Sequence, residues 1–486
     1  MKKLRIALIR PLIRKYRNSQ SPAAFESSIG LVPPLNLCCL AAAVEEAGFE
    51  AAIYDCEANG NEEEDLKRFL TSYAPDVVGI SIITTNFHGA LDTARLSRSL
   101  LPEAKVICGG THMMIFPEET LSYSEFDYGF IGEAERPLVQ FLRALQSGVL
   151  EGPAIPGFVW REGGKTVFNK TYGFNEDLDA LPFPAYHLLD LSKYQMPNAK
   201  STVISLFLSR GCPFDCGFCF RNPQLRRLRF KSVKRAVEEI GHMIRNYSAT
   251  SINFVDEAIT IRKDYFLELC ARMKEQPWRI EWQSPTRVSS IDEEIVTAAK
   301  QAGCHTFRFG IESGSDKILA KINKVITCEM SERAITLCRE YGIKSVGYFI
   351  IGYLGEDATT VRQTIDFACR IRPDYAAFFP AVPMPQTQLC EECEAGGLIP
   401  KNYWRDFVLG KRDDPLPFLM PDAGDLVVRA YKRFYFSPAS IFSVLKRKEF
   451  YRHFLKNVFF GIRLLFLKFK RSGGDPGAAE NGTAAQ

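Results

Sequence analysis

The sequence predicts an α/β chain with two parallel sheets in succession: a doubly wound sheet, then a partial barrel of six strand–helix units. Short apolar runs alternate with helical patterns over residues 4–145 and again over 201–382, and this alternation is typical of parallel sheets. A proline-interrupted stretch separates the two series. Hydrophobic residues make up 46% and charged residues 24% of the chain, which is ordinary globular composition and excludes a largely disordered protein.

The charge balance argues against a nucleic-acid binder. Lys and Arg number 61 against 57 Asp and Glu, a net charge of +4 over 486 residues, whereas a nucleic-acid-binding surface needs a larger and clustered basic excess. The length leaves room for about three domains of ordinary size.

Residues 1–145 are predicted to form the first domain. Its strands are expected at 5–9, 49–55, 77–83, 104–110 and 128–132, with helices such as 37–48 and 90–101 between them. Ligands of doubly wound sheets bind at the carboxyl ends of the strands, near the point where the strand order reverses.

Residues 146–200 are predicted to be a connector with a small hairpin that turns at Gly163–Gly164. Residues 201–382 form the predicted barrel, whose site is expected at the carboxyl ends of the strands. The expected strands are 202–209, 251–256, 280–285, 306–312, 345–352 and 375–381.

The C-terminal part divides into a mostly helical region, 383–471, and a small polar tail, 472–486, expected to be disordered. Within it, 445–471 carries nine Lys or Arg residues and one acid. This pattern fits an interfacial amphipathic helix, and equally a helix packed on the barrel with a solvated basic face.

The predicted location is the cytoplasm. No segment reads as membrane-spanning, and the N-terminus reads as a buried strand rather than a signal peptide. The 14 cysteines are spread along the chain, which disfavours a secreted disulfide scaffold.

The strongest chemical signal is the C-x3-C-x2-C motif of Cys212, Cys216 and Cys219, directly after a predicted strand. Three thiolates on one loop are one ligand short of a structural zinc site or a fully ligated cubane cluster. A [4Fe–4S] cluster held by three cysteines keeps one iron open. The alternatives are incidental thiols, or a zinc site completed by a distant histidine.

This motif, with Phe218 before its last cysteine, resembles the signature of the radical S-adenosylmethionine (SAM) family. The resemblance implies a [4Fe–4S] cluster whose open iron binds SAM, and reductive cleavage of SAM to a 5′-deoxyadenosyl radical that abstracts hydrogen from substrate. The six-unit partial barrel is the fold of that family.

Further positions at the predicted strand ends match SAM contacts of the family. The simpler explanation for each is a strand-end polar residue that caps a helix or satisfies backbone. The resemblance implies as cofactor-binding residues Phe218, Asp256, Glu257, Arg287, Glu312, Ser313 and Gly352.

In the first domain, Ser81–Ile83 and Gly109–Gly110 resemble the S-x-L…GG pattern of cobalamin-binding domains. Over about residues 4–395 the order of motifs is similar to that of the cobalamin-dependent radical SAM family. The implied cobalamin contacts are Ser81, Thr84, His88, Gly109, Gly110 and His112.

One departure concerns the cobalt ligand. The loop after the first strand contains no histidine, whereas cobalamin domains of the mutase type carry D-x-H-x-x-G there. We therefore expect cobalamin bound with its histidine ligand off. His88 and His112 remain candidates for corrin contact, with solvent exposure an equal alternative.

Cys390 and Cys393 form a C-x-x-C pair in a helical pattern. An auxiliary cluster or redox pair needs more ligands than two, so chance is favoured. The other cysteines are most simply small core residues.

The resemblance implies a cobalamin-dependent radical SAM enzyme, with methyl transfer from methylcobalamin to an unactivated carbon as its leading reaction. The alternatives are oxidative cyclisation or rearrangement without methyl transfer, a tRNA-modifying sulfur-insertion enzyme, and a corrinoid-binding sensor or carrier. The expected partners are a small-molecule or lipid-like substrate and a one-electron reductant such as flavodoxin or ferredoxin. No nucleic acid is expected, and peripheral membrane contact would use residues 445–471.

Overall fold

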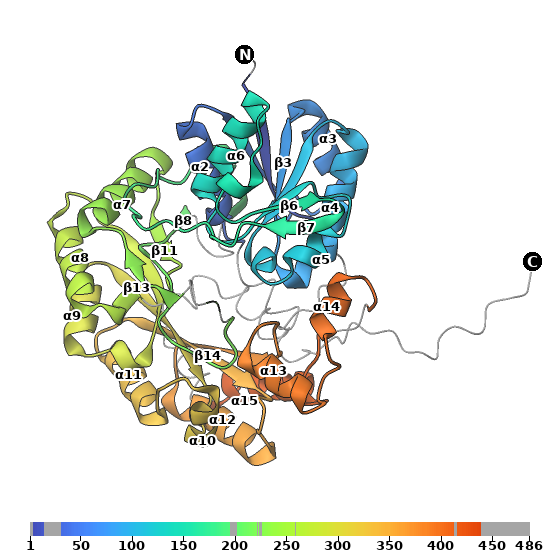
Figure 1. Cartoon of the computed structure of the whole chain (residues 1–486). Helices are drawn as coiled ribbons and strands as arrows, with labels where there is room; N and C mark the ends of the chain where they lie inside the picture. The colour runs from blue at the N-terminus through green and yellow to red at the C-terminus, as the bar shows by residue number, and fades with distance from the viewer. Residues whose placement is uncertain are drawn as a thin grey trace, which may run out of the picture.

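The computed structural model describes residues 3–13, 31–194, 202–220, 222, 226–257, 259–412 and 416–438. These residues form two large sheets, one after the other along the chain (Figure 1). Two predicted segments, 445–471 and 472–486, lie outside the described residues, as does most of the loop that follows the first strand.

The first sheet has seven strands in the order β2-β1-β3-β4-β5-β6-β7. The first five are parallel, and the hairpin of β6 and β7 adds to β5 in antiparallel pairing. The hairpin predicted within the connector thus extends the first sheet. The strands are β1 (Arg5–Arg10), β2 (Glu50–Asp55), β3 (Val77–Ser81), β4 (Lys105–Gly109), β5 (Tyr128–Phe130), β6 (Phe158–Glu162) and β7 (Lys165–Phe168).

Helices cover both faces of this sheet, because successive residues of each strand point to opposite faces. Ile6 and Leu8 of β1 pack toward α2 and α6, whereas Ala7 and Ile9 pack toward α3 and α4. The helices of this part are α2 (Leu35–Glu46), α3 (Glu63–Tyr73), α4 (Phe87–Leu100), α5 (Pro117–Leu121) and α6 (Glu135–Ser147).

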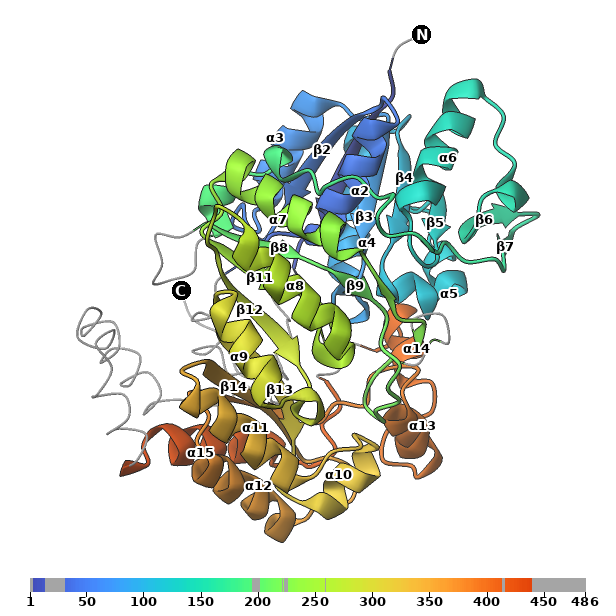
Figure 2. The ribbon, with the colours of Figure 1, turned by 90° about the vertical axis from the view of Figure 1, so that its left-hand side faces the viewer.

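The second sheet has six parallel strands in the order of the sequence. Its helices lie on the outer side of a curved sheet (Figure 2), and no pairing among the described residues joins its two edges, β8 and β15. The strands are β8 (Val203–Leu206), β11 (Ser251–Phe254), β12 (Glu281–Thr286), β13 (Cys304–Glu312), β14 (Lys344–Ile351) and β15 (Tyr375–Pro380). The helices are α7 (Val233–Tyr247), α8 (Lys263–Glu275), α9 (Glu293–Gln301), α10 (Asp316–Ile322), α11 (Cys328–Glu340) and α12 (Ala358–Ile371).

Three helices follow β15: α13 (Gln388–Ala395), α14 (Tyr403–Val408) and α15 (Ala423–Tyr435). Helix α15 packs on β15, and α14 lies against α5 of the first part. The predicted fold class, a doubly wound sheet followed by a partial barrel and a mostly helical C-terminal region, is confirmed. Among the described residues, no helix has the length and apolar character needed to cross a membrane.

Candidate functional site

A pocket of about 490 Å³ lies where the carboxyl ends of strands from both sheets face each other. The first sheet contributes the ends of β3 and β4, next to the reversal of strand order between β1 and β3. The second contributes Phe207, Val255 and Glu257, which follow β8 and β11. Both positions are where parallel α/β folds bind ligands.

Two glycines that follow one another at the end of β4 line this pocket. A Cβ atom on Gly109 would meet only the Phe130 carbonyl oxygen, 4.0 Å away, so a side chain there would occupy the pocket itself. Gly110 has φ 103°, and a Cβ there would lie 2.5 Å from the Ile82 oxygen. The bare backbone at Gly109 suits the approach of a large, flat ligand such as a corrin, whereas the glycine at position 110 permits the close contact with the Ile82 backbone.

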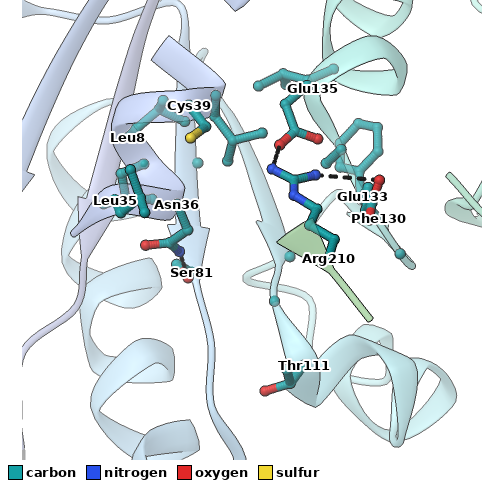
Figure 3. Close-up of a pocket in the computed structure, with 18 of the residues that line it drawn as sticks. Leu8, Leu35, Asn36, Cys39, Ser81, Thr111, Phe130, Glu133, Glu135 and Arg210 are labelled. Atoms are coloured by element: carbon teal, nitrogen blue, oxygen red, sulfur yellow. Dashed lines mark hydrogen bonds and ion pairs between the residues drawn. The ribbon is translucent and has the colours of Figure 1, made fainter. Parts of the chain in front are cut away.

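Ser81 also lines the pocket, and its hydroxyl oxygen accepts a hydrogen bond from Asn36 Nδ2 at 3.0 Å (Figure 3). Of the six predicted cobalamin contacts, the structure therefore brings Ser81, Gly109 and Gly110 together in one pocket.

The other three predicted cobalamin contacts do not line it. The fully buried His112 ring lies between Thr84 and Thr120, at 3.1 and 2.9 Å. The Thr120 hydroxyl donates to the Phe116 carbonyl, so its oxygen accepts from His112 Nε2, and Nδ1 accepts from Thr84. Burial lowers the pKa of His112 to about 3, which keeps the ring neutral.

His88 serves the packing between distant segments. Its Nε2 lies 2.9 Å from the Phe407 carbonyl oxygen in α14, and its ring lies edge-on to the Phe407 ring.

The three predicted cluster ligands lie on the loop that connects two short strands, β9 (Ser209–Arg210) and β10 (Arg229–Phe230). The two strands pair in antiparallel fashion, so they hold the two ends of this cysteine loop together. Gly217 fixes the tip: its N–H donates to the Ile322 carbonyl at 2.7 Å, and its own carbonyl accepts from Leu389 N at 2.9 Å. Cys212 is half-buried, Cys216 buried and Cys219 exposed.

The donor set fits a metal cluster in its chemistry, although the described residues include no group of three or more His, Cys, Asp or Glu side chains placed to hold a metal ion. The Cys219 side chain is partly exposed, but the protein around its sulfur removes enough water to raise the pKa of the thiol to about 12, and neighbouring Cys216 adds to this effect. A thiolate at Cys219 therefore needs a nearby cation, and a metal binds thiols in deprotonated form.

Arg287 lies directly against this loop. Its guanidinium stacks 3.6 Å above the Phe214 ring centroid, and its Nη1 lies 4.0 Å from Cys216 Sγ. Its Nη2 donates to the Lys324 carbonyl.

Lys324 joins two further predicted SAM contacts. Its ammonium pairs with Glu312 at 2.8 Å and lies 5.6 Å from the Phe218 ring centroid. Glu312 has φ 67°, a conformation that costs a non-glycine residue energy and that clusters at functional sites. Arg287, Glu312 and Phe218 are thus gathered beside the cysteines.

The remaining predicted SAM contacts divide into two kinds. Asp256, Ser313 and Gly352 bond to neighbouring protein: Asp256 accepts from Ser209, the Ser313 hydroxyl lies 3.0 Å from that of Thr364, and Gly352 N–H donates to Glu356. Glu257 instead lines the pocket.

Four charged pocket residues were not predicted as site residues: Glu133 and Glu135, which follow β5, and Arg210 and Arg229, which lie opposite each other in β9 and β10. Arg210 lies between the two carboxylates (Figure 3). The signal in the sequence was the GEAE run directly after a predicted strand.

Cys390 and Cys393 are free, buried thiols of α13. Burial raises the pKa of both, which favours the inert thiol form.

Comparison with known proteins identifies the class. Residues 23–142 match the model of the B12 binding domain, and residues 206–368 match that of the radical SAM superfamily. The chain is therefore a radical SAM enzyme with a cobalamin-binding domain.

Similar proteins of known name show which kinds of enzyme in this class the chain resembles. The chain is 32% identical to an uncharacterized methyltransferase of Pyrococcus horikoshii, over 90% of this chain and 94% of the relative. It is 28% identical to the anaerobic magnesium-protoporphyrin IX monomethyl ester cyclase of Rubrivivax gelatinosus (86% and 76%), and 29% identical to cytidylyl-2-hydroxyethylphosphonate methyltransferase of Streptomyces wedmorensis (75% and 78%). The chain belongs to the cobalamin-dependent radical SAM family of methyltransferases and cyclases.

Solved structures share the fold. The TsrM methyltransferase of Kitasatospora setae, with cobalamin and a [4Fe–4S] cluster bound, has a TM-score of 0.64 at 19% identity, covering 81% of this chain and 76% of TsrM. OxsB, with aqua-cobalamin and SAM bound, has a TM-score of 0.63 at 19% identity, covering 86% of this chain and 57% of OxsB. The predicted family, enzymatic nature and cofactor classes are confirmed.

Proposed function

We propose that this enzyme transfers a methyl group to an unactivated carbon of a small-molecule substrate held in the pocket between the two sheets. The observation that carries the proposal is that the pocket is shared: Gly109 and Gly110 line it from one side, and Arg210 and Gly211, immediately before Cys212, line it from the other. When bound, the cluster supplies the electron that cleaves SAM to a 5′-deoxyadenosyl radical, and cobalamin supplies the methyl group.

The chain's own residues would hold and orient these groups. Cys212, Cys216 and Cys219 would ligate three irons of the cluster. Arg287 would hold the SAM carboxylate, because its guanidinium is beside Cys216 and fixed by stacking on Phe214.

Two carboxylates would serve the SAM ammonium and ribose. Glu257 lines the pocket, and burial raises the pKa of its carboxyl, so a cationic ligand would stabilise its ionised form. Glu312 is held next to the cysteines by Lys324.

On the cobalamin side, Ser81, Gly109 and Gly110 would contact the corrin. Since neither His88 nor His112 lines the pocket, we propose cobalamin without a histidine ligand.

Cyclisation without methyl transfer is the second candidate, because the cyclase of Rubrivivax gelatinosus aligns with 86% of this chain. The pocket walls are largely apolar around their few polar groups, with Leu8, Leu37, Ile107 and Phe130 among them. Such a lining suits either reaction on an apolar or lipid-like molecule.

A cytoplasmic location and a one-electron reductant such as flavodoxin or ferredoxin complete the proposal. The basic segment 445–471 would contact anionic membrane surface if the substrate is lipid-like.

Anaerobic reconstitution with iron, sulfide and hydroxocobalamin, followed by reduction in the presence of SAM, tests the function. Methyl transfer predicts release of both 5′-deoxyadenosine and S-adenosylhomocysteine, since one SAM supplies the radical and another the methyl group. Release of 5′-deoxyadenosine alone in the presence of substrate would favour cyclisation. Zinc bound in place of the iron–sulfur cluster would contradict both methyl transfer and cyclisation.

A further inference from the structure

The cysteine loop is connected at both of its ends to residues of the first sheet. Strands β9 and β10 close its base, and there Arg210 and Arg229 lie directly opposite each other. Arg210 is two residues before Cys212. Whatever fixes these two arginines fixes the start and the end of the cysteine loop.

Glu133 binds both arginines. Its carboxylate lies 2.7 Å from Arg229 Nη2 and 3.3 Å from Arg210 Nη1, and a second contact to Arg229 Nη1 measures 3.1 Å. Glu135 adds an ion pair to Arg210 at 2.6 Å. The four side chains are between 6% and 18% exposed, so solvent screens these charges little.

The two carboxylates are themselves held in place. Asn175 donates its backbone N–H to Glu133 at 2.7 Å and its side-chain amide to Glu135 at 2.8 Å. The Phe174 ring lies 3.7 Å from the Arg229 guanidinium carbon. Such bonds limit the positions that the side chains can adopt.

This placement favours a positioning role. Buried ion pairs contribute weakly to net stability but can fix one geometry among several. Glu133 and Glu135 (Figure 3) follow β5, and they line the same pocket as Gly109 and Gly110. They therefore tie the cysteine loop to the edge of the sheet that carries the proposed corrin contacts.

We propose that Glu133, Glu135, Arg210 and Arg229, the inter-domain ion-pair network, are positioning residues that set the separation between the iron–sulfur cluster and the cobalt. The inference rests on the proposed function, because it needs both groups in the places given above. A rigid separation matters because a radical made at one group must meet a methyl donor at the other, and small misplacements of reacting groups are costly.

The test measures that separation directly. In the reduced holoenzyme, the cluster and Co(II) of the corrinoid are both paramagnetic, and their dipolar coupling in pulsed electron paramagnetic resonance falls with the cube of their distance. The first variant is Glu133→Gln. The second is the double variant Glu133→Gln with Arg229→Gln, which removes both charges and so leaves no unpaired buried charge.

The matched control is Glu176→Gln. Glu176 pairs with Arg227, which lies two residues before Arg229 at the end of the cysteine loop. The Glu176 and Arg227 side chains are 58% and 62% exposed, so this ion pair is on the surface. We expect one resolved coupling in the wild type and in Glu176→Gln. We expect a shifted or broadened coupling in the double variant, at unchanged iron and cobalamin content.

Unchanged coupling in the double variant would overturn the proposal. Failure of the double variant to fold would also overturn it, because the network would then be required for folding and not for positioning. Absence of the cluster or cobalamin signal from the wild type would contradict the proposed function itself, which separates the two failures.

Discussion

Asp256 accepts hydrogen bonds from three donors where β8 leads into the cysteine loop: Leu208 N, which lies 3.0 and 3.1 Å from the two carboxylate oxygens, and the N–H and hydroxyl of Ser209. Burial raises the pKa of its carboxyl to about 6. The resemblance to the radical SAM family implied that Asp256 contacts SAM, because the family places the contact to the SAM amino group at this strand end. It could not show these acceptor roles, since the donors lie 47 and 48 residues away along the chain.

Replacement of Asp256 by alanine is expected to lower the free energy of unfolding by about 2–4 kcal/mol, because Leu208 N and Ser209 N lose their acceptor in the interior. Asp256→Asn keeps one acceptor oxygen and should lose less. Urea denaturation of the cofactor-free proteins gives the measurement. An alanine variant as stable as the wild type would show that the carboxylate is not a structural acceptor.

Glu356 gives a residue-scale prediction on pH. One carboxylate oxygen accepts from the backbone N–H groups of Gly352 and Tyr353, and burial raises the pKa of the carboxyl from 4.5 to about 7. Between these values the folded protein holds a proton that the unfolded chain has released, so the free energy of unfolding falls as pH rises.

Glu356→Gln removes this titration. From about pH 5 to about pH 8, the stability of the wild type relative to the variant should fall by about 2 kcal/mol. Denaturant midpoints at both pH values measure the difference, and the exposed Glu340→Gln serves as control. A wild-type-to-variant difference that does not change with pH would contradict the assignment.

Among the secondary-structure elements, helix α15 covers the edge of β15 that no strand pairs with among the described residues, and two of its tyrosines bind the backbone there. The Tyr431 hydroxyl accepts from Phe378 N at 3.1 Å, and the Tyr435 hydroxyl accepts from Ala376 N at 3.2 Å and donates to the Ala376 carbonyl at 3.0 Å. An edge strand exposes unpaired backbone groups that promote association with other chains. Helix α15 therefore substitutes for the missing next strand.

The double variant Tyr431→Phe with Tyr435→Phe should lose about 1–3 kcal/mol of stability, because buried N–H groups lose their acceptors while the rings keep their packing. Urea denaturation measures the loss. Wild-type stability in the double variant would rule out an edge-capping role for the two hydroxyl groups.

Helices and strands could be predicted from the sequence where the spacing of apolar residues alone determines the type of element. Strand β14 was predicted at 345–352 and occupies Lys344–Ile351, with burial alternating residue by residue. The hairpin of β6 and β7 was predictable, but its place in the first sheet was not. That place depends on Gly157, where a Cβ would lie 2.1 Å from the Ile131 oxygen, a long-range close approach that no local pattern encodes.

In the molecule as a whole, the candidate site also combines residues that local patterns predict with residues that only long-range packing brings together. Cys212, Cys216 and Cys219 carry a spacing that predicts cluster ligands without a structure. Glu133 and Arg229 carry no such spacing, since they lie 96 residues apart and meet only when the two sheets pack. Local sequence patterns therefore predict the chemistry of each half, whereas the relation between the halves depends on long-range packing.

Separate elements hold the proposed cofactor sites, so each should be removable without the other. Cys216→Ala removes one thiol of the predicted cluster and leaves the first sheet untouched. The variant should lose cluster iron and 5′-deoxyadenosine release but retain cobalamin, as measured by iron content, product release and corrinoid absorbance.

Gly109→Phe should do the reverse. The position has no neighbour closer than 4.0 Å to an added Cβ, so the ring enters the pocket with little cost to the fold and takes the space of the corrin. Iron content and a melting temperature close to wild type should accompany lost cobalamin, while Gly109→Ala, which adds one methyl group, should weaken binding less. Retention of cobalamin by a folded Gly109→Phe protein would place the corrin elsewhere and break the link between this pocket and the chemistry assigned to it.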